Sequence, residues 1–268
     1  MSIRDAKVFK IVPNALTIGN SLCGFIAIIY TLRVYDNTAS NMLRVFVVSA
    51  WMIFAAMIFD ALDGLAARTF NATSMTGIQM DSLSDMVTFG VAPATLVAIM
   101  THSLRDYPLG PWQELIVYAL CSVYLGCAAL RLAIYNVKAI TEHKNSKSFS
   151  GLPSPGAAAA ICVTIFFVYS LSTRETSRID LNRLAFILPV YAAVLGILMV
   201  SSVPYLHVGK WLVSMFRNRR KQLFFAVLVV LVAIFRINAL AAIVTGYIFS
   251  GPLSLLLPKK IRKRIFED

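Results

Sequence analysis

Four aspartates at regular spacing are the residues of this sequence that are best suited to chemistry. They belong to the pattern D-x2-D-G-x2-A-R-x8-G-x3-D-x3-D, which begins at Asp60 and ends at Asp85. Residues spaced by three, four, seven and eight positions share one face of an α-helix. The pattern therefore predicts two helical stripes, the first made of Asp60, Asp63, Gly64, Ala67 and Arg68, and the second of Gly77, Asp81 and Asp85.

Both stripes lie at the ends of strongly apolar segments, where a buried charge is costly unless it binds something. If the two stripes face each other, four carboxylates converge, and their mutual repulsion at low dielectric favours divalent cations as ligands. A site built only from oxygen ligands indicates Mg²⁺ or Mn²⁺. The segment from Asp60 to Gly64 lacks the alternating acidic order of an EF-hand loop, which excludes that kind of calcium site.

The composition indicates a polytopic membrane protein. Of the 268 residues, 58% are hydrophobic and only 14% are charged, and the mean hydropathy is +0.73. The net charge of +12 is spread among the apolar segments, so anionic lipid headgroups are expected as partners and nucleic acid is not. We expect an all-α bundle of about eight transmembrane helices, with a six-helix catalytic core and a C-terminal pair.

Eight apolar segments approach the length that a bilayer span needs. They are Ala15–Leu32, Leu43–Leu62, Met86–His102, Trp112–Tyr135, Pro155–Leu171, Leu184–Val203, Leu223–Phe235 and Ala239–Leu257. The last two are separated by Arg236 and Asn238, which indicate either an external turn or a break inside one tilted span. The basic segment Met1–Lys10 predicts an interfacial helix that precedes the first span. The predicted division is a core of residues 1–202 and a C-terminal part of residues 203–268.

The distribution of Lys and Arg predicts the orientation. With eight spans, 17 of the 25 basic residues lie on the side of the N-terminus, seven lie on the other side and Arg131 lies inside a span. The excess of basic residues marks the cytoplasmic side. We therefore expect both termini and the aspartate motif to face the cytoplasm from a bacterial or archaeal-type cytoplasmic membrane.

The aspartate motif resembles the signature of the CDP-alcohol phosphotransferase family, with a match at every fixed position. The resemblance implies a CDP-activated donor, two divalent cations and a homodimer. It also implies that Asp85 is the base that accepts the proton of the alcohol, whereas spacing alone would leave Asp81 as an equally good candidate. A second family run, P-N-x-x-T-x-x-N, begins at Pro13 and implies that Thr17 and Asn20 contribute to the nucleotide pocket.

The remaining motif residues suit a bound CDP-lipid. Gly64, Ala67 and Gly77 have small or absent side chains, so a nucleotide can approach the helix backbones closely. Arg68 offers a planar fork of hydrogen-bond donors to a phosphate. Two divalent ions would stabilise the attacking and the leaving oxygen of the phosphoryl transfer, with Asp60, Asp63, Asp81 and Asp85 as their ligands.

Three further segments resemble the phosphatidylserine synthase branch of this family: Asp85–Pro93, Ala129–Asn136 and Phe149–Ala157. The resemblance implies CDP-diacylglycerol as donor and L-serine as acceptor. We expect Arg131 to bind the serine carboxylate and Ser150 and Ser154 to line the acceptor pocket. Arg131 could instead form a structural ion pair or reach toward the membrane surface, and the two serines could be helix caps.

Two alternatives remain at the level of function. Within the family, the acceptor could be glycerol 3-phosphate, inositol or choline. A phosphorylated acceptor would require additional cations, and the loop from Phe70 to Thr76 contains none. A cation transporter could also use intramembrane aspartates as a relay. An arginine beside those carboxylates favours a phosphate site over a cation path.

Overall fold

The protein is an all-α membrane bundle. The computed structural model describes residues 3–36, 39–69, 74–105, 107–141, 151–173, 181–205 and 219–255. The elements in these ranges are the helices α1 (Ile3–Leu32), η1 (Arg33–Asp36), α2 (Ala39–Thr69), α3 (Met75–Asp85), η2 (Met86–Val91), α4 (Ala92–Ser103), α5 (Pro111–Thr141), α6 (Ser154–Ser172), α7 (Leu181–Val200) and α9 (Arg219–Ser254).

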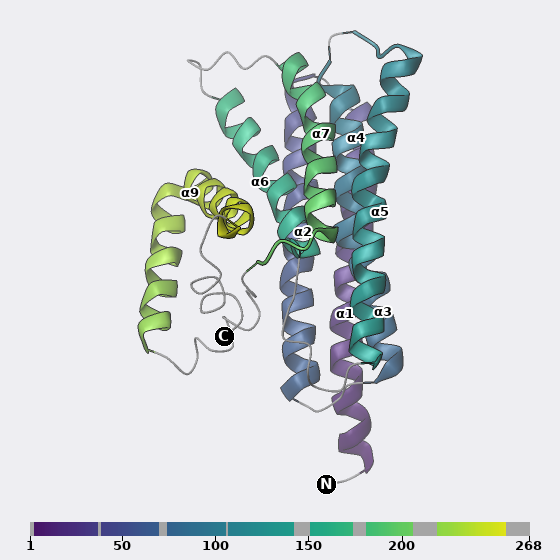
Figure 1. The fold of residues 1–268 in the computed structure, drawn as a ribbon, viewed down its shortest axis with the longest axis vertical. Coiled ribbons are helices and arrows are strands. Elements are labelled where there is room, and N and C mark those ends of the chain that lie inside the picture. Colours follow the sequence, from purple (N-terminus) through teal and green to yellow (C-terminus); the bar gives the residue numbers. More distant parts are fainter. Residues whose placement is uncertain are drawn as a thin grey trace.

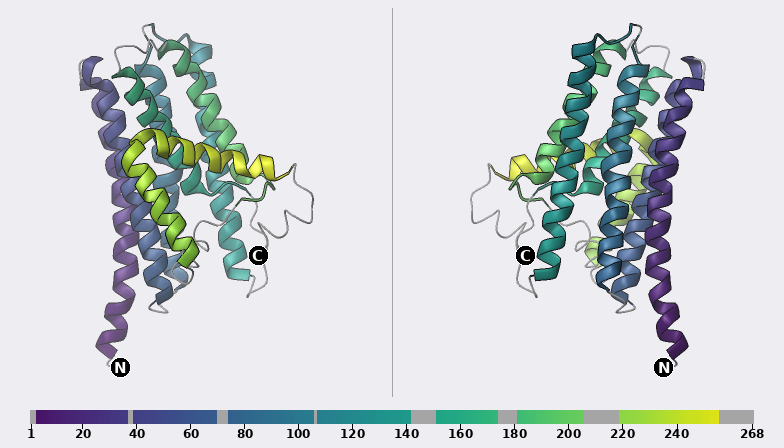
Figure 2. Two further views of the ribbon diagram at one scale, coloured as in Figure 1. Left: turned by 90° about the vertical axis from the view of Figure 1, so that its left-hand side faces the viewer. Right: turned by 90° about the vertical axis from the view of Figure 1, so that its right-hand side faces the viewer.

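Seven helical segments among the described residues are long and apolar enough to cross a membrane. This confirms the polytopic helical class, but not the predicted count of eight. Where the sequence suggested a C-terminal pair, one helix, α9, continues without a turn through Arg236 and Asn238. The helix is bent, and its second half runs across the bundle rather than along it (Figures 1 and 2). The side chains of the predicted span Leu223–Phe235 lie outside the described residues.

The prediction of a separate interfacial helix in the basic N-terminal segment is wrong. This segment forms the first turns of α1, which runs unbroken from Ile3 to Leu32 with Pro13 inside it. Figure 1 shows these turns continuing along the axis of the first span, beyond the rest of the bundle. The correction has a physical reason, because Lys and Arg are good helix formers and a helix that leaves the membrane can continue into water.

The helices differ in length, and this difference sets the level of the site. Helices α6 and α7 have 19 and 20 residues, whereas α2 and α5 each have 31. At 1.5 Å per residue, a helix of 20 residues is about 30 Å long, which matches the hydrocarbon core of a bilayer. The lower ends of α6 and α7 therefore lie partway along the longer helices (Figure 1), at the level expected for one membrane boundary.

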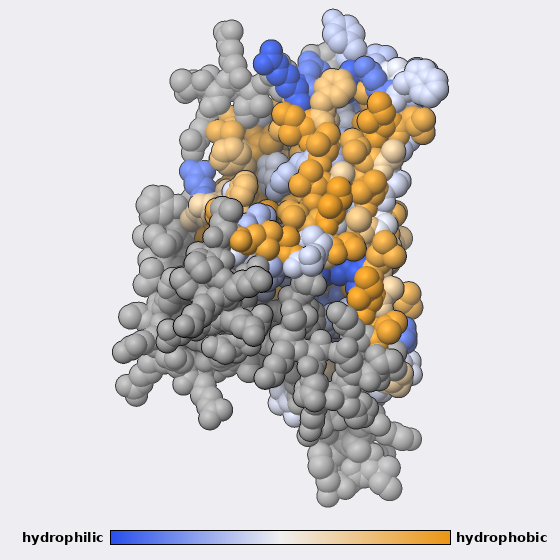
Figure 3. All heavy atoms as spheres, viewed as in Figure 1, coloured by the Kyte–Doolittle hydropathy of each residue, from blue (hydrophilic) through white to orange (hydrophobic). Residues whose placement is uncertain are grey.

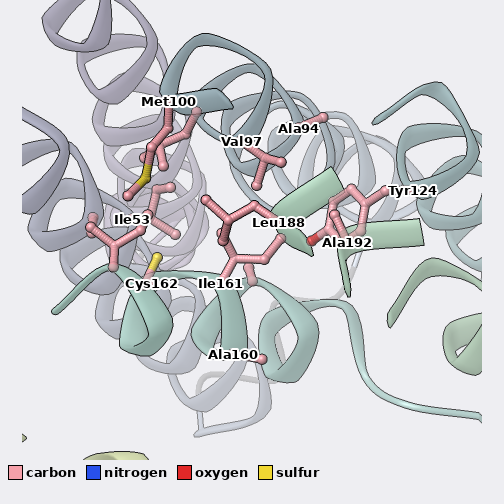
Figure 4. Close-up of a cluster of buried hydrophobic side chains, with 14 of the residues drawn as sticks. Ile53, Ala94, Val97, Met100, Tyr124, Ala160, Ile161, Cys162, Leu188 and Ala192 are labelled. Carbon is pink, nitrogen blue, oxygen red and sulfur yellow. The ribbon is translucent and has the colours of Figure 1, made fainter. Parts of the chain in front are cut away.

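A continuous apolar core joins α2, α4, α5, α6 and α7. Met100 and Val97 of α4 lie beside Ile53, Ile161 and Leu188 from three other helices (Figure 4). Alanines at the facing positions let the helix backbones approach, as small residues do in membrane bundles. The outer face is apolar as well (Figure 3), and α7 exposes Ile187, Val190, Val194 and Ile197. An apolar interior and an apolar exterior together are the mark of a lipid-embedded bundle.

Candidate active site

The carboxylates of two helices converge at the membrane boundary. Asp60 and Asp63 lie near the end of α2, and Asp81 lies on α3, which follows α2 after a short connection. One carboxylate oxygen from each of these three residues lies within 4.8 Å of the others. Asp85, one turn further along α3, is close enough to interact electrostatically with Asp60 and Asp81. The structure thus brings the four predicted carboxylates into one neighbourhood, with three of them in a tight cluster.

Helix α1 supports this cluster from a third side. The Thr17 hydroxyl lies 2.9 Å from Asp63 Oδ2 and 3.0 Å from its own helix carbonyl at Pro13, so it can donate to either. The Asn20 amide donates to Asp85 Oδ1 over 3.1 Å. Both residues are buried, with exposed fractions of 5% and 0%. Hydrogen bonds to a buried carboxylate offset part of the cost of removing its charge from water.

Local sequence explains how α3 begins. Ser74 is the N-cap of α3, and its hydroxyl accepts a hydrogen bond from the Gly77 amide over 3.0 Å. Serine at this position satisfies one of the amides that the first helical turn leaves without a partner. A side chain at Gly77 would come within 3.1 Å of the Ser74 hydroxyl and 3.7 Å of Asn14 Oδ1. Glycine therefore keeps the space between α1 and α3 open.

Immediately after Asp85 the helix changes its winding. Residues Met86–Val91 form the π-helix η2, which leads directly into α4. Inside η2, the Thr88 hydroxyl lies 3.2 Å from the Asn20 carbonyl and 3.0 Å from the Ser84 carbonyl. Gly24 of α1 faces this point, and a side chain there would come within 2.6 Å of the Thr88 hydroxyl. Short π-helical turns are frequent at functional sites, and this one fixes Asp85 against α1.

Two buried oxygens at the site have no hydrogen-bond partner among the described residues. They are Asp81 Oδ1 and Asn20 Oδ1. A buried acceptor without a donor is costly, and carboxylate and amide oxygens are the ligand types that Mg²⁺ and Mn²⁺ take. The donor set of this site therefore fits a divalent cation held by oxygen ligands.

A pocket opens beside the carboxylates, between α1, α2 and α3. It is lined by Pro13, Asn14, Thr17, Asp63, Gly64, Ala67, Ser74, Gly77, Ile78 and Asp81. Four residues that we predicted to bind the CDP-lipid line it, namely Thr17, Gly64, Ala67 and Gly77. Asn20 lies one helical turn from Thr17, and the side chain of Arg68 lies outside the described residues.

Four residues of this pocket were not predicted from the sequence, namely Pro13, Asn14, Ser74 and Ile78, and two of them, Asn14 and Ser74, are polar. Asn14 belongs to the P-N-x-x-T-x-x-N run, in which only Thr17 and Asn20 were predicted to have a role. Ser74 lies in the connection before Gly77, where its value as an N-cap gave the only available signal. Their side chains meet around Gly77, so both shape the pocket.

The predicted acceptor residues form a second group at the ends of α6 and α7. Arg131 of α5 donates a hydrogen bond to the Met199 carbonyl over 3.0 Å, at the C-terminal end of α7. Gly151 lies in the left-handed region, with φ of 90°, and a side chain there would overlap the same carbonyl. Ser154 is the first residue of α6, and its hydroxyl is buried without a hydrogen-bond partner in the described part of the chain. Ser150 lies outside the described residues.

Arg131 lies at the level of Asp85 along the bundle. Helix α5 passes α3 and η2, as shown by the hydrogen bond from Ser82 to Asn136 over 2.7 Å and by the packing of Gly90 against Ala128. Arg131 lies between Ala128 and Asn136 on α5. Asp85 lies between Ser82 and Gly90 on the segment formed by α3 and η2. The guanidinium of Arg131 meets the end of α7 through the Met199 carbonyl.

A family model for CDP-alcohol phosphatidyltransferases matches residues 10–203. The chain belongs to this family. The matched region contains the carboxylate cluster, the pocket beside it and Arg131. Membership in a transferase family removes the support for the cation-transporter alternative, and it confirms the resemblance noted in the sequence.

Three proteins that are similar to this chain share one name. A CDP-diacylglycerol–serine O-phosphatidyltransferase of Helicobacter pylori is 32% identical over 195 residues, which are 72% of this chain and 70% of the relative. The enzyme of the same name in Bacillus subtilis is 36% identical over 156 residues, 58% of this chain and 75% of the relative. One from Methanocaldococcus jannaschii is 28% identical over 169 residues, 63% of this chain and 69% of the relative.

Replacing one cluster carboxylate should weaken cation binding measurably. We expect Asp81→Asn to reduce Mn²⁺ affinity by at least about tenfold, because it removes a negatively charged ligand. The measurement is a Mn²⁺ titration of the detergent-purified protein, followed by the electron paramagnetic resonance signal of the free ion. Asp36→Asn is the matched control, since Asp36 is exposed in η1, about 24 Å along the helix from Asn20. Equal Mn²⁺ affinity of the Asp81→Asn variant and the unaltered protein would contradict the site.

Proposed function

We propose that this protein transfers a phosphatidyl group from CDP-diacylglycerol to the hydroxyl of L-serine and releases CMP. The observation that carries the proposal is the position of Arg131 and the orphan Ser154 hydroxyl at the membrane boundary, with Arg131 level with Asp85. The names of the relatives support the same donor and acceptor. The site offers a carboxylate cluster for the phosphates and a cation for a carboxylate-bearing alcohol.

Asp60, Asp63, Asp81 and Asp85 are the residues that would hold the divalent cations, Mg²⁺ or Mn²⁺. Such ions would neutralise the phosphates of the donor and stabilise the attacking and leaving oxygens of the transfer. The chain itself contributes the fixed positions of these oxygens, through the hydrogen bonds from Thr17 and Asn20.

The donor nucleotide would occupy the pocket between α1, α2 and α3. Gly64, Ala67 and Gly77 leave its walls free of bulky side chains, and Thr17, Asn20 and Arg68 would contribute polar groups toward the nucleotide and its phosphates. The acyl chains would remain among the lipids, because the pocket lies at the ends of transmembrane helices that are apolar on their outer faces.

Asp85 would accept the proton of the serine hydroxyl. As that proton leaves, the serine oxygen forms its bond to the phosphorus of the phosphatidyl group, and the bond from phosphorus to the CMP oxygen breaks. Asn20 holds Asp85 in place with a single hydrogen bond from its amide. A carboxylate within reach of the alcohol is a suitable general base.

Arg131 would bind the serine carboxylate through its planar guanidinium, and Ser154 would offer its hydroxyl to the polar groups of serine. The predicted role of Ser150 in lining the acceptor pocket stays a prediction, because Ser150 lies outside the described residues. We further propose that the active site and the N-terminus face the cytoplasmic side of a bacterial or archaeal-type membrane, on the side where Lys and Arg are in excess. The same side for the C-terminus was predicted from an even number of spans and stays a prediction, because α9 is one helix where a pair was expected. The homodimer implied by the family resemblance also stays a prediction.

The acceptor can be identified by a direct assay. Purified protein in detergent with CDP-diacylglycerol and Mn²⁺ should form a radiolabelled lipid from L-serine, and none from glycerol 3-phosphate, inositol or choline. Excess chelator should abolish the reaction, because the four carboxylates and the phosphates repel one another without the cation. Turnover with a different alcohol, or full turnover in chelator, would overturn the proposed acceptor or the proposed cation requirement, respectively.

The role of Asp85 as a base predicts a loss that is confined to rate. Asp85→Asn should lower kcat by about 10²–10⁴-fold, the usual contribution of general base catalysis, while the KM for CDP-diacylglycerol changes little. Asparagine keeps an oxygen for the cation, so the comparison is made at saturating Mn²⁺, but the amide cannot take a proton. Steady-state kinetics with each substrate varied in turn will measure both constants. A variant that retains normal kcat would exclude Asp85 as the base, and Asp81 would then be the next candidate.

The role of Arg131 predicts a loss that is confined to the acceptor. Arg131→Ala should raise the KM for serine by at least tenfold, with little change in the KM for CDP-diacylglycerol. Arg131→Lys should recover it only in part, because an ammonium group cannot form the two parallel hydrogen bonds of a guanidinium. Equal damage toward both substrates would indicate that Arg131 serves mainly to cap α7 through the Met199 carbonyl.

A further inference from the structure

The second half of α9 lies outside the family domain and yet reaches the neighbourhood of Arg131. The family match ends at residue 203, whereas this helix continues to Ser254. Figures 1 and 2 show its second half crossing the bundle near the lower ends of α6 and α7. That is the level of Ser154 and Met199, where the acceptor residues lie.

Tyr205 anchors α9 at this place. Its hydroxyl donates to the Ile248 carbonyl over 3.0 Å, and its side chain is only 3% exposed. The ring lies over Gly251, where any side chain would collide with it. The Tyr205 and Tyr247 rings are also in contact, with centroids 5.6 Å apart. The segment that follows α7 thus holds one face of α9 through a hydrogen bond and close packing.

Tyr247 of α9 packs against the first turn of α6. A side chain at Gly156, in the first turn of α6, would come within 3.2 Å of Tyr247 Cε1. The segment that leads into α6 meets Arg131, because a side chain at Gly151 would come within 3.0 Å of Arg131 Nη1. Tyr247 and Tyr135 of α5 are both close enough to the guanidinium to interact with it electrostatically. The carbonyl of Met199 therefore fixes one end of the guanidinium, and Tyr247 packs against the first turn of α6 in the same neighbourhood.

A tyrosine in this position has two physical effects. Its ring excludes water from the guanidinium, which strengthens the attraction between arginine and a carboxylate by lowering the local dielectric. Its bulk also restricts the volume next to the arginine, so that an acceptor with additional carbon atoms would meet the ring.

We propose that α9 forms one wall of the acceptor pocket, with Tyr247 as the residue that positions Arg131 and limits the size of the acceptor. The proposal rests on the proposed role of Arg131 in binding the serine carboxylate. Tyr247 is a positioning and specificity residue and takes no part in the transfer of the proton or the phosphatidyl group.

The test is a kinetic comparison of Tyr247→Ala and Tyr247→Phe with the unaltered full-length protein. We expect Tyr247→Ala to raise the KM for serine by about tenfold, because it exposes the guanidinium to water. The KM for CDP-diacylglycerol and the kcat for serine should change by less than about threefold. The ratio of kcat/KM for L-threonine to that for L-serine should rise by at least about tenfold, since threonine adds one methyl group. Tyr247→Phe, which keeps the ring, should preserve this ratio.

Two glycines of α9 offer a matched pair that leaves Tyr247 itself intact. Gly251→Leu forces the Tyr205 ring aside and should reproduce the threonine preference of Tyr247→Ala. Gly246→Leu is the control, because Gly246 is exposed and a Cβ there has no atom of the described residues within 4 Å. Tyr191→Phe, in the middle of α7, controls for the loss of a half-buried phenol elsewhere. If Gly251→Leu prevents folding, as judged by thermal unfolding in detergent, Tyr205→Phe provides a milder loss of the same anchor.

The outcomes separate this proposal from the function on which it rests. If Arg131→Ala leaves the KM for serine unchanged, the proposed function of Arg131 fails. If Arg131→Ala raises that KM while Tyr247→Ala changes neither it nor the threonine ratio, the wall formed by α9 is refuted. If Arg131→Lys and Tyr247→Ala each raise the KM for serine, a double variant whose effect is smaller than the product of the two single effects supports action through the arginine. A double-variant effect equal to the product of the two single effects would show that Tyr247 acts independently of Arg131, contrary to the proposal.

Discussion

Repulsion among carboxylates is the constraint on which the arrangement of this protein depends. Asp60, Asp63 and Asp81 place oxygens within 4.8 Å of one another at the boundary of an apolar bundle, where like charges interact strongly. Nothing in the intrinsic preferences of α2 and α3 would bring these charges together. The arrangement needs a scaffold that holds the helices from outside and a counter-charge that makes the convergence favourable.

Helix α1 is that scaffold. The side chains of Thr17 and Asn20 donate hydrogen bonds to two of the carboxylates. The backbone carbonyls of the same two residues accept hydrogen bonds from Ser84 and Thr88, which precede and follow Asp85 in the sequence. These bonds couple the backbone of α1 to the turn of α3 and η2 that carries Asp85. The π-helical turn then redirects the chain into α4, whose residues Val97 and Met100 are part of the core. The site is therefore supported directly by the packed interior of the bundle.

The sequence predicted those parts of the molecule that depend on local pattern. The predicted spans Trp112–Tyr135 and Pro155–Leu171 lie within α5 and α6, since long apolar runs limit the possible positions of a membrane helix. The spacing of the aspartates also led to two helices that face each other. The π-helix η2 could not be predicted, because a change from α to π winding depends on contacts such as that between Thr88 and Gly24.

The C-terminal region shows where such reasoning ends. The apolar composition of residues 239–257 indicated a span, and by length and composition Ile237–Ser254 still qualifies as one. Its direction across the bundle depends on Tyr205, Gly251 and Gly156, which are distant in sequence and carry no periodic signal. The two-helix pair and the separate N-terminal helix were predicted from composition at the ends of the bundle, where composition is a weak guide to direction.

The unequal lengths of the helices have a consequence for how such a protein meets its substrate. Because α6 and α7 end where the hydrocarbon ends while α2 and α5 continue, the carboxylates lie at the depth of lipid headgroups. A lipid donor can then be taken from the plane of the bilayer and returned to it without its acyl chains crossing water. We expect the velocity of such a protein to follow the mole fraction of donor in the surface that surrounds it, so that adding inert detergent at constant total donor would slow it by surface dilution.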